Sequence, residues 1–298
     1  MNREEFLGQP DIHAFISWLS TDVCTRVFTL SIKPSRFVPD GLNVRVEGIE
    51  GLVSNYLWKS RWLDTRTNSF INSGDWETTK ASLKRLREWL KESVTNSDQS
   101  QTLAASKAVL EWGGVRNAKP FIEELAKQGQ LTSYLKSVRD LLSTNRSPSQ
   151  KISDIDATNI LKFDSGLTKI HSFLDDSGSP IYDSRVAAAI SLFYCLYQEN
   201  SLKPSKPTIS FPCGAARGKQ VRNPRDFGYK RAKSLFTETS HHEWARTQLQ
   251  LGWIIIELLR RNQKILESEG SLLGRAHAFE AGLFMAGYDL RCFNLPIR

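Results

Sequence analysis

Apolar residues recur at helical spacing along most of this 298-residue chain after Gly48, and this pattern restricts its fold more than any other feature. Such spacing places apolar side chains on one face of a helix, and that face must pack against other elements. We therefore predict a mainly α protein. The expected helices span Gly51–Leu63, Asp75–Val94, Ala104–Trp112, Lys119–Gln128, Leu131–Leu142, Ile155–Lys162, Leu167–Leu174, Ser184–Tyr197, Glu243–Leu266 and Ala276–Met285.

The N-terminal region has a different pattern. One short helix is expected at Ile12–Leu19, and two runs suited to β-strands follow at Arg26–Ile32 and Leu42–Val46. A Pro-Asp-Gly break separates the two runs, so a small sheet or hairpin is expected there. The predicted organisation is a mixed α/β element over residues 1–50 and a helical domain over residues 51–298, together forming one compact unit.

The composition excludes several classes of protein. Hydrophobic residues make up 40% of the chain and charged residues 24%, which is typical of a folded globular protein. No apolar run approaches the roughly 20 residues of a membrane span. The strongest one, Leu249–Leu259, is too short and ends at two arginines. The N-terminus lacks the apolar core of a signal peptide. We therefore expect a cytoplasmic protein that does not associate with membranes.

Cysteine and histidine spacing does not predict a metal site. The four cysteines are scattered and never form a CxxC pair, so we expect free thiols rather than zinc ligands or disulfides. His241 and His242 are adjacent at the start of a predicted helix, where neighbouring residues point to different faces. We predict no metal and no cofactor, and we expect a monomer.

Positive charge is concentrated in one segment. The chain has a net charge of +8, and residues Arg217–Lys233 alone carry +6. A basic loop with interleaved aromatic residues suits contact with a phosphate backbone, because each cation displaces condensed counterions. The alternative is a solvated loop that keeps the protein soluble. The cations of this segment are Arg217, Lys219, Arg222, Arg225, Lys230, Arg231 and Lys233.

The stretch Asn159–Leu196 carries the pattern with most chemical content. It reads as a tight turn at Ser165-Gly166, a short helix bearing Lys169, and an extended step, Pro-Ile-Tyr-Asp, into an Ala-rich helix. Asp183 ends this step at the expected helix N-cap. The simplest interpretation of Asp183 is therefore a capping residue, which contributes about 1 kcal/mol.

The same stretch resembles the helix-hairpin-helix (HhH-GPD) DNA glycosylase superfamily, which includes the adenine and 8-oxoguanine glycosylases. In that superfamily a glycine-rich hairpin followed by lysine precedes a Pro-Val-Asp or similar step, whose Asp is essential for base excision. Pro180–Asp183 matches the step, and Thr168–Ile170 matches the lysine end of the hairpin. The hairpin here keeps one glycine, Gly166, and the 14 residues from Lys169 to Asp183 are fewer than usual.

The resemblance implies a helical glycosylase fold and DNA as the partner. It assigns base excision to Asp183, whose carboxylate would stabilise an oxocarbenium-like centre or activate water. It also implies that Lys169 could attack C1′ and form a Schiff base, although a surface lysine is the alternative. The residues expected to contact DNA are Gly166, Arg185, Arg217, Lys219, Arg222, Arg225, Lys230 and Arg231.

A base must be flipped out of the helix to reach such a site, and it then needs a stacking surface. Tyr182 is the nearest aromatic residue to the candidate aspartate, and Trp112 precedes two glycines that allow a close backbone approach. Trp58 lies in another aromatic run. We expect these three residues to form the base pocket, with core packing as the alternative for each.

Three functions follow as hypotheses. The leading one is a DNA glycosylase-like enzyme that excises a damaged or modified base. Because the hairpin departs from the usual pattern, the substrate could be a hypermodified phage pyrimidine removed in antiphage defence. The second is a non-catalytic DNA-binding protein with a glycosylase-like fold. The third is a protein–protein adaptor whose basic loop only aids solubility.

Overall fold

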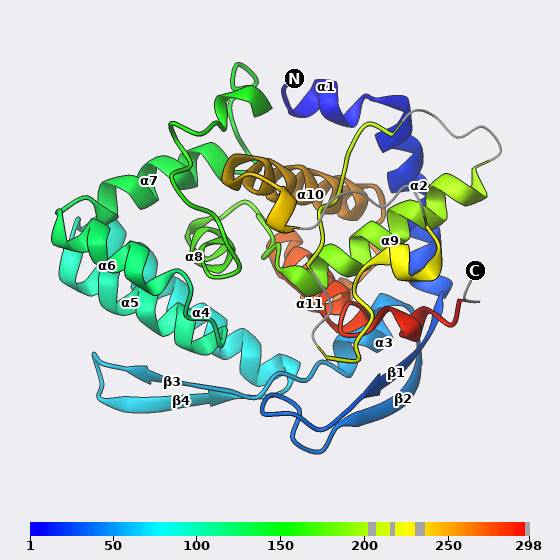
Figure 1. Cartoon of the computed structure of the whole chain (residues 1–298), viewed down its shortest axis with the longest axis horizontal. Helices are drawn as coiled ribbons and strands as arrows, with labels where there is room; N and C mark the ends of the chain where they lie inside the picture. The colour runs from blue at the N-terminus through cyan, green and yellow to red at the C-terminus, as the bar shows by residue number, and fades with distance from the viewer. Residues whose placement is uncertain (202–206, 215–217, 230–235, 296–298) are drawn as a thin grey trace.

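The computed structural model describes residues 1–201, 207–214, 218–229 and 236–295, and these form a mainly helical structure with two small antiparallel hairpins (Figure 1). The prediction of a mainly α protein is therefore confirmed. The strands are β1 (Val27–Ile32), β2 (Leu42–Glu47), β3 (Ser60–Asp64) and β4 (Ser69–Ser73). The helices are α1 (Arg3–Leu7), α2 (Pro10–Thr25), α3 (Gly48–Ser54), α4 (Trp76–Thr95), α5 (Gln99–Trp112), α6 (Lys119–Lys127), α7 (Leu131–Leu142), α8 (Leu167–Leu174), α9 (Ser184–Asn200), α10 (His241–Arg261) and α11 (Leu272–Ala286).

The N-terminal hairpin lies where the sequence predicts it. Strands β1 and β2 pair in a register that runs from Val27 opposite Glu47 to Ile32 opposite Leu42. Phe28 and other alternate side chains of β1 point into the core, which is the period-two burial expected for a strand with one solvated face. Helix α2, which precedes it, is longer at both ends than the predicted Ile12–Leu19.

The predicted helix at Gly51–Leu63 is wrong in its second half. Helix α3 ends at Ser54, and β3 begins at Ser60 and pairs with β4. The connecting turn contains Asn68 with a φ of 49°, and Asp64 accepts the backbone N–H of Arg66. Trp62 is fully buried while neighbouring Arg61 is exposed, so the burial has strand periodicity here. Turn chemistry therefore prevails over the apparent helical spacing.

The predicted helix at Ile155–Lys162 is also wrong, because these residues form turns. The cause is local. The Asp156 carboxylate accepts the backbone N–H groups of Thr158 and Asn159 at 2.9 and 3.2 Å. Such short side chains offer the backbone an alternative to helical hydrogen bonds. The hairpin at Ser165-Gly166 is thus followed by a helix, α8, but is not directly preceded by one.

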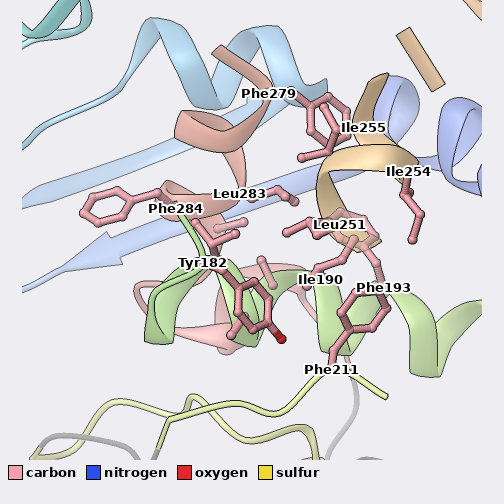
Figure 2. Close-up of a cluster of buried hydrophobic side chains, with 14 of the residues drawn as sticks. Tyr182, Ile190, Phe193, Phe211, Leu251, Ile254, Ile255, Phe279, Leu283 and Phe284 are labelled. Atoms are coloured by element: carbon pink, nitrogen blue, oxygen red, sulfur yellow. The ribbon is translucent and has the colours of Figure 1, made fainter. Parts of the chain in front are cut away.

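The buried apolar side chains form two clusters. The first joins α2, α3 and β1 to α9, α10 and α11, and Figure 2 shows part of it around Leu251 and Phe193. The second lies among α4–α8 and includes Trp62 and Trp89. The N-terminal fifty residues therefore pack with the C-terminal helices, and the candidate site lies where the two clusters meet. Within the described ranges, every helix is too short or too polar to cross a membrane.

Candidate active site

Asp183 lies at the boundary between the two clusters because of the extended step that precedes α9. Ile181 belongs to the second cluster, whereas its neighbour Tyr182 belongs to the first. Successive side chains of an extended segment point to opposite sides, so this step passes between the two clusters. Asp183 then caps α9, with its Oδ1 atom accepting the backbone N–H groups of Arg185 and Val186 at 2.9 and 3.3 Å.

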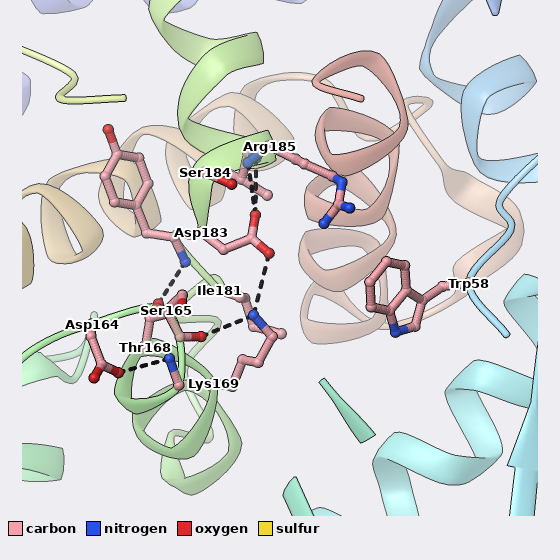
Figure 3. A network of polar contacts seen from close by, with 12 residues as sticks. Trp58, Asp164, Ser165, Thr168, Lys169, Ile181, Asp183, Ser184 and Arg185 are labelled. Atoms are coloured by element: carbon pink, nitrogen blue, oxygen red, sulfur yellow. Dashed lines mark hydrogen bonds and ion pairs between the residues drawn. The ribbon is translucent and has the colours of Figure 1, made fainter. Parts of the chain in front are cut away.

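The second carboxylate oxygen of Asp183 faces Lys169 (Figure 3). The distance from Lys169 Nζ to Asp183 Oδ2 is 3.2 Å, and the two side chains are only 6% and 7% exposed. Burial by itself raises the pKa of a carboxyl. The charges of Lys169 and Arg185, together with the two backbone N–H groups, nevertheless keep the pKa of Asp183 below its ordinary value. Asp183 is therefore a buried anion at neutral pH.

Lys169 is positioned by the hairpin and by α5. Its Nζ also donates to the carbonyl oxygen of Ser165 at 3.0 Å. On the other side, Gly113 leaves space for its side chain, because a Cβ there would lie 2.6 and 2.7 Å from Lys169 Cδ and Cε. The interpretation of Lys169 as a surface lysine is therefore wrong. The two candidate catalytic residues form one buried ion pair.

Next to this ion pair lies a narrow, partly enclosed pocket with a cavity volume of about 30 Å³, which is room for one or two water molecules, so a base enters it only if side chains of its wall move. Trp58 and Trp112 line it, as expected for a base pocket, and Figure 3 shows Trp58 across from Lys169 and Asp183. The indole N–H of Trp58 donates to the Trp112 carbonyl oxygen at 3.3 Å. The ring of Phe37 stacks on the ring of Trp58, with 3.8 Å between the ring centres. Trp76 and Phe284 extend the aromatic wall. The pocket thus presents flat apolar faces beside a pair of charges.

Tyr182 does not line this pocket, so its predicted role as a stacking residue is not supported. Its ring is fully buried in the first cluster, and its hydroxyl donates to the Pro212 carbonyl oxygen at 2.8 Å. Its backbone N–H donates to Thr168 at 2.7 Å. The step that points Asp183 toward the pocket points the adjacent ring away from it, and sequence adjacency is therefore misleading here.

Gly166 is buried rather than open to a phosphate. Its N–H donates to Asp164 Oδ1 at 2.8 Å, and the same oxygen accepts from Leu167 at 3.0 Å. A Cβ at Gly166 would lie 2.7 Å from Leu110 and 2.9 Å from Ala118, so this glycine permits close packing of the hairpin. A carboxylate already occupies its N–H group, and the predicted DNA contact of Gly166 is not supported.

Arg185 lies beside the pocket, held over aromatic rings. Its guanidinium carbon is 4.9, 4.8 and 4.4 Å from the ring centres of Trp58, Phe284 and Tyr288. Cation–π contacts of this kind orient an arginine without neutralising it. Arg185 therefore adds positive charge close to Asp183 and to the pocket wall.

The predicted basic loop separates into different environments. Arg217, Lys230 and Arg231 lie outside the described residues. Lys219 and Arg225 are exposed, as a phosphate-binding role requires. Arg222 is only 3% exposed, and its guanidinium donates to Ser184 Oγ and to the Tyr288 carbonyl oxygen, both at 3.3 Å. The predicted DNA contact of Arg222 is therefore not supported, because its guanidinium holds this segment against the start of α9.

Sequence reasoning missed two titratable residues of the pocket, both on α11. Glu280 and His277 line the cavity together with the ion pair. Arg87 of α4 donates a hydrogen bond from Nη1 to His277 Nε2. Burial, with the charges of Arg87 and Lys91, lowers the pKa of His277 well below its ordinary value. One signal in the sequence could have identified these residues: an Arg, a His and a Glu lie within an otherwise apolar helix. Such residues are rarely buried without a partner, so a polar site was to be expected there.

We expect Gly113→Ala to reduce the activity proposed below for this site about 100-fold, because a displacement of about 1 Å in a positioned group can have an effect of that size. The methyl group would push Lys169 away from Asp183. Gly113 has a φ of −75°, which alanine adopts readily, so the backbone conformation is not strained. The rate of that proposed reaction, compared between the variant and wild type, measures the effect.

The same substitution in a Lys169→Ala background is the control for that prediction. If Gly113 acts through the lysine, adding Gly113→Ala there changes nothing further, since the two effects are coupled. Independent, additive losses from the two substitutions would contradict this role of Gly113.

The described part of the chain contains no group of three or more His, Cys, Asp or Glu side chains that could hold a metal ion. Comparisons of the chain with protein-family models, with curated proteins and with solved structures found no match. The residues of the pocket are therefore the basis for inferring its chemistry.

Proposed function

We propose that this protein is a DNA glycosylase-like enzyme, which flips a damaged or modified base into the pocket and excises it. The observation that carries the proposal is the buried Lys169–Asp183 ion pair, 3.2 Å long, on the wall of an aromatic cavity. Flat apolar walls suit a planar heterocycle. The adjacent charged side chains can act on C1′, the sugar carbon to which that base is attached.

The fixed anion of Asp183 supports cleavage of an N-glycosidic bond. As the bond between C1′ and the base breaks, its two electrons leave with the base and positive charge develops on the deoxyribose. A carboxylate that is already oriented by two backbone N–H groups stabilises this charge without reorganisation. In the hydrolytic route, water then bonds to C1′, and Asp183 accepts the proton that the water loses.

Lys169 supports a second route. Its Nζ can transfer a proton to Asp183 Oδ2 across the 3.2 Å contact and then attack C1′ as a neutral amine. The base departs with the electrons of the broken bond. Opening of the sugar ring then gives a Schiff base, from which strand cleavage follows. The two routes differ in whether the DNA becomes attached to the protein.

The test is to incubate the protein with genomic DNAs, including phage DNAs that carry hypermodified pyrimidines, and to identify released bases by mass spectrometry. Release of one base with formation of abasic sites is the expected result. Borohydride reduction distinguishes the routes, because it traps DNA on Lys169 only if the Schiff base forms. Salt-dependent DNA binding without release of any base would contradict the proposed glycosylase function. It would favour the alternative of a non-catalytic DNA-binding protein.

The exposed cations of the 218–229 segment support DNA as the partner. Arg222 ties this segment to Ser184, the residue after Asp183, so Lys219 and Arg225 lie on a segment that reaches the start of the catalytic helix. We expect replacing both with alanine to weaken DNA binding uniformly across sequences. Loss of two phosphate contacts lowers the salt slope of log K by roughly 2.

Fluorescence anisotropy with a labelled duplex at several salt concentrations measures this slope. Lys127→Ala combined with Lys264→Ala is the matched control, since both lysines are exposed and lie on other parts of the chain. If the two double variants had equal slopes, the cations of the 218–229 segment would contribute no more to DNA binding than other exposed cations of the chain.

A further inference from the structure

Glu280 lies in the wall of the same pocket but takes no part in the chemistry described above. It comes from α11, is 9% exposed, and its Oε2 accepts the backbone N–H of Ile181 at 3.2 Å. Ile181 belongs to the step that ends at Asp183, so this hydrogen bond fixes the carboxyl of Glu280 relative to the ion pair. Its second oxygen, Oε1, has no hydrogen-bond partner among the described residues.

The charge state of Glu280 follows from its surroundings. Burial raises the pKa of this carboxyl to about 8, and the negative charge of Asp183 acts in the same direction. The Ile181 N–H and the charges of Lys169 and Arg87 act in the opposite direction, but they do not outweigh burial. His277 and Tyr56 also line this part of the cavity. At neutral pH, Glu280 is therefore a protonated acid that can donate a hydrogen bond.

Two other polar residues of the pocket already have hydrogen-bond partners. Lys169 is already bonded to Ser165 and Asp183, and His277 accepts from Arg87. The remaining walls are mainly aromatic or aliphatic side chains. A flipped base in this cavity would thus meet stacking surfaces on several sides and a neutral carboxyl on α11.

We propose that Glu280 binds the flipped base by donating its carboxyl proton to a carbonyl oxygen or unprotonated ring nitrogen of that base. The proposal rests on the glycosylase function, and it deepens that function by assigning to Glu280 a role in binding the base and in its departure.

The same contact assists departure of the base. The electrons of the broken bond leave with the base, so negative charge develops on its carbonyl oxygens and ring nitrogens. A hydrogen bond from Glu280 strengthens as this charge grows, which stabilises the transition state more than the ground state. If the proton transfers fully, the base leaves neutral and Glu280 becomes a carboxylate, which water reprotonates before the next turnover.

The test compares Glu280→Gln and Glu280→Ala with wild type, using the genomic DNA from which wild type releases a base. Glutamine keeps both a donor and an acceptor, so we expect it to retain activity within about 10-fold. Alanine removes the donor, and we expect a loss of about 100-fold or more. Glu257→Gln is the matched control, since this glutamate of α10 pairs with Arg261 outside the pocket. Circular dichroism and thermal melting of each variant establish that it is folded.

The pH profile separates a binding role from a structural one. The protonated form of Glu280 predominates below its pKa, so wild-type activity should fall as the pH rises through about 8. Glutamine does not titrate, and Glu280→Gln should lack this descending limb. A limb that persists in Glu280→Gln, or full activity of folded Glu280→Ala, would overturn the role of Glu280. A wild-type protein that releases no base from any DNA would instead contradict the glycosylase function itself.

Discussion

Replacement of Asp183 by asparagine is expected to reduce base release by about 1,000-fold, the effect of removing a preorganised charge from a transition state. Asparagine has nearly the same shape and caps helices as well as aspartate does, so α9 should still begin at Ser184. What is lost is the negative charge that the proposed mechanism places beside C1′. Single-turnover release of the base, together with circular dichroism of the variant, measures the two properties separately.

Asp98→Asn is the matched control for this prediction. Asp98 caps α5 in the same way, by accepting the N–H of Gln101 at 2.9 Å, but it is exposed and makes no contact with the pocket. We expect it to retain full activity. Full activity of Asp183→Asn on a DNA that wild type cleaves would show that the assigned mechanism is wrong and that Asp183 is only a helix cap.

Gly287→Ala is expected to lower the free energy of unfolding by about 3 kcal/mol or more, because overpacking at a rigid contact is strongly destabilising. A Cβ at this position would lie 1.8 Å from the carbonyl oxygen of Arg185 and 2.5 Å from its carbonyl carbon. Both atoms are backbone, so no side chain can rotate away. Helices α9 and α11 would have to separate, and the start of α9, with Asp183, would move.

Urea unfolding of Gly287→Ala and wild type measures this difference. Gly74→Ala is the control, because the nearest atom to its new methyl group would be Lys59 Cγ at 3.4 Å, an ordinary van der Waals distance. We expect the control to unfold close to the wild-type midpoint. A Gly287→Ala variant as stable as wild type would show that α9 and α11 do not pack this closely.

Several parts of the fold could be predicted because their signals lie within a few residues. The Asp183-Ser-Arg-Val-Ala pattern predicted an N-cap and a helix, and both are present. Helices α7 and α8 have the predicted bounds, and the Pro-Asp-Gly break marks the turn between β1 and β2. In each case the stabilising hydrogen bonds join residues close in the chain, so the chain sequence alone contains the information.

Other local predictions were wrong because two local signals competed. At Ile155–Lys162 the apolar spacing favoured a helix, but the Asp156 side chain captured the backbone N–H groups that a helix would use. At β3 the burial of Trp62 and the turn before Ser69 favoured a strand. The outcome depended on cross-strand pairing with β4, which helical periodicity does not report.

The candidate site was only partly accessible from the sequence. Resemblance to a glycosylase motif pointed to Lys169 and Asp183, but not to the distance between them. The role expected of Arg222 is not supported, because the sequence shows the charge of an arginine but not that it is buried. Glu280 was missed because it lies 97 residues after Asp183, on a helix that only the packing of α11 against α9 brings to the pocket.

The sequence by itself therefore determined the helical class, the N-terminal hairpin, the cap at Asp183 and the excess of positive charge. Only the tertiary structure decided that Lys169 and Asp183 form a buried pair, that Tyr182 points away, and that Glu280 completes the pocket. The physical reason is that caps and turns depend on neighbours in the chain. Burial, ion pairing and a shifted pKa depend instead on which distant helices meet, and here the two hydrophobic clusters meet at Asp183.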